Sequence, residues 1–136
     1  MATEKKPDLR DYFAGAALAN SLAWLTLAAT TVSGIDPLTL AWLSPFLYAL
    51  GAAIAGFLVS RKASQNQLKI GLKSGLDAFI FHVYVFVGVF ELLWGARILS
   101  LYDHLLIFAV FIIGALLGSF LCKQFSRTTK STESVG

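Results

Sequence analysis

The sequence predicts an all-α polytopic membrane protein with four transmembrane helices, arranged as two duplicated helical hairpins. Hydrophobic residues make up 57% of the 136 residues and charged residues only 14%, which is not the composition of a soluble domain. Apolar runs of about twenty residues, the length that crosses a bilayer, recur along the chain. Charged residues gather at the ends of these runs, so the net charge of +3 does not indicate nucleic-acid binding.

The elements of this single membrane domain, residues 1–136, follow in order. A polar tail, 1–11, leads into the first helix near Pro7 or Asp8. At the first turn, Gly34 can adopt a positive φ, Asp36 can cap the next helix and Pro37 suits its first position. A cleavable signal ending near residues 31–34 is the alternative to span one. The expected spans are 12–32, 37–59, 75–94 and 104–122, with a basic loop at 60–74 and a disordered tail at 123–136.

The distribution of Lys and Arg predicts the orientation. Ten of the eleven basic residues lie in the first tail, the middle loop and the last tail, and only Arg97 lies on the other side. Positive loops stay in the cytoplasm, so both termini are expected there and the chain in the cell membrane.

Small residues recur at matching places in spans two and four, which indicates an internal repeat. The matching residues are Gly51, Ala52, Phe57 and Leu58 in span two, and Gly114, Ala115, Phe120 and Leu121 in span four. We interpret this as a duplicated hairpin whose copies insert in the same direction. Chance recurrence of small residues in membrane helices is the alternative.

The same small residues predict how the helices pack, because helices in lipid associate mainly through close contact. Spans two and four are expected to pair within the chain, and dimerisation through the same faces is the alternative. Gly71 and Gly75 are assigned instead to the junction between the loop and span three. The predicted packing residues are Gly51, Ala52, Ala55, Gly56, Gly114 and Gly118.

With its duplicated hairpin, glycine-ended spans and short basic central loop, the chain resembles the small four-helix, Gly-patterned integral membrane proteins of uncharacterised families, many of them archaeal or Gram-positive. Those families have no established activity. The resemblance therefore implies a fold and assigns no catalytic residue.

Span three carries the candidate functional residues. At 100° per residue, Asp77, Tyr84 and Glu91 share one helical face, and a path for protons or a small cation could follow it, with Asn20 of span one as further lining. The structural alternative is that Asp77 caps the start of span three or pairs with Lys73, and that Glu91 pairs with Arg97.

His82 points away from that face and is the deepest titratable residue. It is expected to be neutral and hydrogen-bonded to a hydroxyl or carbonyl group, with metal or haem ligation as the alternative. His104 is expected near the outer surface and Cys122 at the cytoplasmic end, so no metal site and no cofactor is predicted.

Two functions remain. No phosphate-binding loop, GxSxG, HExxH or paired-cysteine motif is present in the sequence, so an enzyme is not predicted. The favoured hypothesis is a structural, accessory or oligomeric component of the membrane, with the lipid bilayer and a homo-oligomer or larger complex as partners. The alternative is a minimal transporter or channel, which must dimerise to build a path lined by Asp77, His82, Tyr84 and Glu91.

Overall fold

The computed structural model describes residues 6–95 and 100–133, and it describes their side chains except at 31, 37–38, 40–41, 90–91, 94 and 127–133. The helices are α1 (Leu9–Ser33), α2 (Pro37–Arg61), α3 (Gln67–Val83), the π-helix η1 (Tyr84–Glu91), α4 (Leu92–Trp94) and α5 (Leu101–Glu133). The predicted fold class is confirmed, because this part of the chain is all-helical and has four segments that are long and apolar enough to cross a membrane. These segments are Leu9–Thr30, Trp42–Arg61, Gln67–Val89 and Leu101–Ser126.

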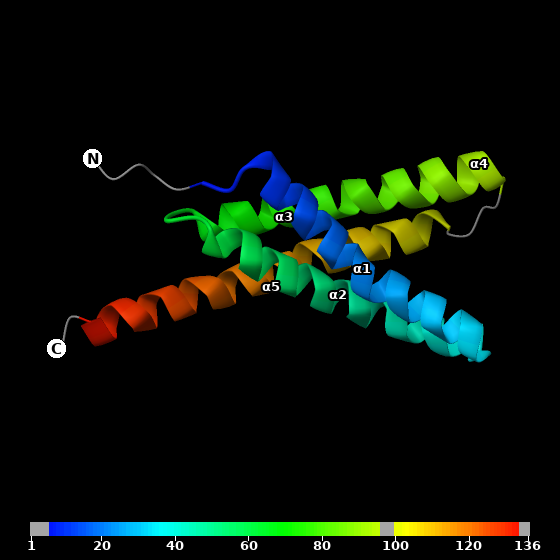
Figure 1. The fold of residues 1–136 in the computed structure, drawn as a ribbon, viewed down its shortest axis with the longest axis horizontal. Coiled ribbons are helices and arrows are strands. Elements are labelled where there is room, and N and C mark those ends of the chain that lie inside the picture. Colours follow the sequence, from blue (N-terminus) through cyan, green and yellow to red (C-terminus); the bar gives the residue numbers. More distant parts are fainter. Residues whose placement is uncertain (1–5, 96–99, 134–136) are drawn as a thin grey trace.

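The helices form two hairpins that cross (Figure 1). One hairpin is α1 with α2, and the other is α3, η1 and α4 with α5. The second arms, α2 and α5, make the most extensive contact in the molecule and run in the same direction. The start of α1 and the end of α5 lie at one end, and the two hairpins diverge toward the other. Both hairpins therefore enter in the same direction, as predicted.

Local sequence sets the helix boundaries at the first turn. α1 begins at a capping box, in which the Asp8 carboxylate accepts from Asp11 N at 3.0 Å and the Asp11 carboxylate accepts from Asp8 N at 3.1 Å. α1 ends at Gly34, whose φ of 67° is the predicted positive value. Asp36 occupies the position before Pro37 but makes no capping hydrogen bond through its side chain, so its expected capping role is wrong.

Two expected boundaries are also wrong. α3 begins at Gln67 rather than Gly75, so most of the expected basic loop is helix. α5 continues to Glu133, through most of the tail that was expected to be disordered. Phe125 explains part of this extension, because its ring packs edge-on against Phe57 of α2 with 6.3 Å between centroids. The last three residues of the chain lie outside the described part.

The crossing of α2 and α5 brings backbone against backbone at the predicted small residues. A methyl group added at Gly56 would overlap the backbone of Ala115, and one added at Gly118 would lie 2.7 Å from the carbonyl carbon of Ala53. One added at Gly114 would lie 3.0 Å from the Ala52 methyl group. The faces expected to pair spans two and four thus meet within one chain.

The remaining small residues join the other helices. Gly51 faces Ala19 of α1, where an added methyl group would lie 3.1 Å from the Ala19 carbonyl carbon. Gly71 and Gly75 face α5, with Ser119 opposite the first and the Phe111 carbonyl oxygen 2.9 Å from a methyl group added to the second. Their assignment to a loop junction is therefore wrong, because both lie inside α3 and hold it against α5.

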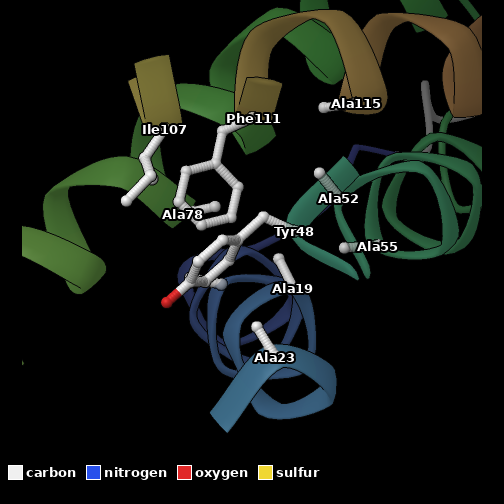
Figure 2. Close-up of a cluster of buried hydrophobic side chains, with 10 residues drawn as sticks. Ala19, Ala23, Tyr48, Ala52, Ala55, Ala78, Ile107, Phe111 and Ala115 are labelled. Atoms are coloured by element: carbon white, nitrogen blue, oxygen red, sulfur yellow. The ribbon is translucent and has the colours of Figure 1, made fainter. Parts of the chain in front are cut away.

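Close backbone approach leaves a core made mostly of alanine. Figure 2 shows Tyr48 and Phe111 as the large side chains in the middle of the cluster, with alanines from α1, α2, α3 and α5 around them. The two rings meet edge-on, with 5.3 Å between centroids. The large aliphatic and aromatic side chains lie mainly on the outer surface, as expected for helices surrounded by lipid.

A methyl group at the helix crossing should therefore destabilise the fold. We expect Gly118→Ala to lower the free energy of unfolding by about 1–3 kcal/mol, because the neighbouring backbone of α2 cannot move away as a flexible side chain could. Titration of the detergent-solubilised protein with a denaturing detergent, followed by circular dichroism, measures the change. Gly88→Ala is the matched control, since nothing lies within 4 Å of a methyl group there. Equal stability of the two variants would contradict the close packing of α2 and α5.

Candidate functional site in the helix interior

A buried amide links α1 to α3. Asn20 is fully buried, and its Nδ2 donates to the carbonyl oxygen of Ala16 at 2.9 Å and to that of Ala78 at 3.1 Å. Both amide hydrogens are thus engaged by backbone of two different helices. This arrangement fixes the orientation of the amide. Exchanging its oxygen and nitrogen would place Oδ1 beside the carbonyl oxygens of Ala16 and Ala78, and three acceptors cannot hydrogen-bond to one another.

The amide in turn sets the protonation of His82. Asn20 Oδ1 lies 3.2 Å from His82 Nδ1, and an amide oxygen can only accept. Nδ1 of the neutral ring therefore carries the proton, and Nε2 carries the lone pair. His82 was expected to be hydrogen-bonded to a hydroxyl or carbonyl group, and the structure shows it buried, with the amide oxygen of Asn20 as its partner.

Aromatic rings enclose the His82 imidazole. Phe86 of η1 stacks on it with 4.5 Å between centroids, and Tyr48 meets it edge-on at 5.2 Å. Phe111 of α5 lies at 5.9 Å. Trp24 supports this layer, because its Nε1 donates to the Tyr48 hydroxyl at 3.2 Å. The site is therefore an apolar cage around one imidazole.

The structure brings the two histidines together, which the sequence did not predict. The rings of His82 and His104 lie 6.1 Å apart between centroids, and their planes cross at 69°. Both His82 Nε2 and His104 Nδ1 are buried, and neither has a hydrogen-bond partner among the described residues. A buried polar atom left without a partner costs about 1–3 kcal/mol. Ser74 Oγ is a third such atom among the described residues.

A second polar cluster, formed by serines, lies nearer the end where the chain starts. The hydroxyls of Ser60 and Ser119 are 2.7 Å apart, and Ser119 also donates to the carbonyl oxygen of Ala115 at 2.9 Å. Ser60 donates to the carbonyl oxygen of Gln67 at 3.2 Å, which ties α2 to the start of α3. The sequence analysis did not identify these serines, although each lies beside a small-residue motif.

The predicted polar face of span three does not form a common site. Tyr84 is 73% exposed on the outside of the helices, whereas Asp77 is half-buried. The π-helix begins at Tyr84 and has a wider turn than the 100° step that the prediction assumed. The side chain of Glu91 and the whole of Arg97 lie outside the described residues. Of the four candidate residues whose side chains the structure describes, a hydrogen bond joins Asn20 and His82.

Two basic residues, Lys73 of α3 and Lys62 at the end of α2, contact α1. Asp77 cannot cap α3, which begins at Gln67. Lys73 Nζ lies over the ring of Tyr12, 3.8 Å from its centroid. Lys62 forms an ion pair with the Asp11 carboxylate, and this hydrogen bond raises the pKa of the exposed Lys62 ammonium group. These contacts join α1 to the neighbouring helices at the surface.

The described residues contain no group of three or more His, Cys, Asp or Glu side chains that could hold a metal ion. Cys122 is buried at the far side of the serine cluster, near Gln67 Nε2 at 3.7 Å. The chain was compared with protein-family models, curated proteins and solved structures, and none of these matched it.

Removing the buried amide should weaken the link between α1 and α3. We expect Asn20→Leu to lower the free energy of unfolding by about 1–3 kcal/mol, because it leaves His82 Nδ1 without a partner and removes the bond from α1 to the Ala78 carbonyl of α3. Denaturing-detergent titration measures the loss. Ser21→Ala is the matched control, since that hydroxyl bonds only to its own helix, at the carbonyl of Leu18. A loss in the control as large as in Asn20→Leu would contradict the linking role of the amide.

Proposed function

We propose that the protein is a non-catalytic multi-pass component of the cell membrane, acting as a structural, accessory or oligomeric element. The observation that supports this function best is how the buried polar side chains are used. Asn20, Ser60 and Ser119 all bond across helix boundaries to backbone or to each other, so these groups hold helices together. None of the three is free to act on a substrate.

The outer surface supports a role in contact with lipid and membrane partners. Large side chains are exposed along both hairpins, among them Trp42, which is 77% exposed, and Phe46, which is 73% exposed. Lipid chains or another membrane protein can cover such a surface without loss of hydrogen bonds. The concentration of basic residues at one end of the spans supports placing both termini in the cytoplasm.

A minimal proton or cation transporter is the second candidate, and His82 is the observation that favours it. A buried imidazole with an unshared lone pair is a group that can accept a proton within a membrane. The exposure of Tyr84 means that a path along span three would need a second copy of the chain to cover it. Asp77 and Glu91 would then lie at the two ends of that path.

Mild extraction of the tagged full-length protein from its native membrane tests the favoured function. We expect it to elute with a stoichiometric membrane partner or as a homo-oligomer, because its apolar surface is extensive for so small a chain. Size-exclusion chromatography with light scattering and protein mass spectrometry measures this association. A chain that is monomeric and without partners in several mild detergents would contradict the accessory role.

Flux measurements in liposomes separate the two candidates. We expect no proton or cation flux above that of empty liposomes, since Asn20, Ser60 and Ser119 are engaged between helices. A pH-sensitive dye inside the liposomes gives the readout. Flux that is present in the wild type and lost in Asp77→Asn and Glu91→Gln would instead support the transporter.

A further inference from the structure

The only two histidines of the chain lie side by side inside the protein, and their geometry points to a metal site. We propose that His82 Nε2 and His104 Nδ1 together bind a single copper(I) ion. Each nitrogen is buried and without a hydrogen-bond partner among the residues that the structure describes. The inference concerns this pair alone and does not depend on the accessory function.

The first ligand is already set for metal binding. Asn20 accepts the proton of His82 Nδ1, and its own amide hydrogens are fixed by the carbonyls of Ala16 and Ala78. His82 Nε2 therefore presents a lone pair, which is the form in which imidazole binds a metal. Metal-binding histidines commonly donate their other ring nitrogen to an acceptor that fixes the ring in this way. Asn20 thus has the position of an orienting residue.

The second ligand comes from the first turn of α5. His104 follows Asp103, whose carboxylate accepts from the backbone nitrogen and the hydroxyl of Ser100 at 2.8 and 2.7 Å. One oxygen of Asp103 is therefore engaged at the start of the helix, and Asp103 does not form a three-residue metal-binding group with the two histidines. The site has two neutral nitrogens and no carboxylate within the described residues.

The spacing of the rings fits an ion held between two nitrogens. Nitrogen ligands lie about 2 Å from such a metal, so two imidazoles on nearly opposite sides of it have centroids about 6 Å apart. The observed distance between centroids is 6.1 Å. A tetrahedral ion such as zinc would need two more ligands, and the described residues offer none.

The surroundings of the two histidines favour an ion with one positive charge over an ion with two. Phe86, Tyr48 and Phe111 surround the His82 ring, and aromatic faces attract cations only modestly. Among the described residues no carboxylate completes a metal-binding group with the two histidines, so a divalent ion would be strongly disfavoured there. Copper(I) carries one charge and is stable with two nitrogen ligands in line. The chemistry of the site therefore selects copper in its reduced state.

Nitrogen-15 NMR of the full-length protein in detergent tests the proposal without any substitution. With histidine labelled, four ring nitrogens are observed, because the chain has two histidines. We expect one equivalent of copper(I), added anaerobically with ascorbate, to shift His82 Nε2 and His104 Nδ1 and to leave the proton on His82 Nδ1. Unchanged ring nitrogens at one equivalent would overturn the site, and water or direct packing would then occupy the space between the rings.

Competition with a chromogenic copper(I) chelator measures the affinity and assigns the ligands. We expect His104→Ala to weaken binding by more than about 100-fold, and Asn20→Leu to weaken it by about 10- to 100-fold, as for loss of an orienting partner. We choose to substitute His104 rather than His82 because His104 is less buried. The melting temperature of each variant reports whether it is folded.

The one cysteine provides the matched control, because a thiolate is a soft ligand that copper(I) favours. We expect Cys122→Ser to bind copper(I) with unchanged affinity, since Cys122 lies in the serine cluster and not beside the histidines. Binding that is lost in Cys122→Ser and kept in His104→Ala would overturn the proposal and assign the metal to the thiol.

Discussion

The approach of two backbones at the crossing of α2 and α5 determines the rest of this fold. Gly56 and Gly118 each face the backbone of the opposite helix at distances that exclude a side chain. In lipid, helices gain little by hiding apolar surface and associate through such close contact. Once the second arms of the hairpins are fixed in this way, α1 and α3 can only pack on their flanks. α1 packs on α2 and α3 packs on α5, and both contacts are less extensive than the contact between α2 and α5.

Close approach also limits where large side chains can be buried. Most of the core is alanine, and Tyr48 and Phe111 are the large rings in its middle. The only deeply buried imidazole lies beside these rings. The polar and aromatic interior is therefore a consequence of the hairpin geometry, because the crossing itself has no space for a ring. Asn20 and His82 occupy the nearest position where two helices are far enough apart.

The sequence predicted those parts of the structure that depend on local composition. Span lengths, the turn at Gly34 and the pairing of glycine faces follow from hydropathy, φ preference and side-chain size. The sequence did not predict features that depend on how far one helix is displaced along its axis relative to its neighbour. α4 extends beyond the first turn of α5, which places His104 at the level of His82, and no spacing rule contains that offset. The π-helix likewise begins at Tyr84, so the 100° step that related Tyr84 to Glu91 does not hold there.

The buried amide of Asn20 orients the His82 ring whether or not a ligand is bound. Asn20 is held by two backbone carbonyls, so its oxygen stays directed at His82 whether or not the other ring nitrogen has a partner. The lone pair on Nε2 is thus preorganised by contacts that belong to the fold. A purely structural histidine would not require this arrangement, because an apolar ring of similar size would fill the cage without the unsatisfied Nε2 of His82. The cost of retaining an imidazole there is the physical reason to look for a ligand between the rings.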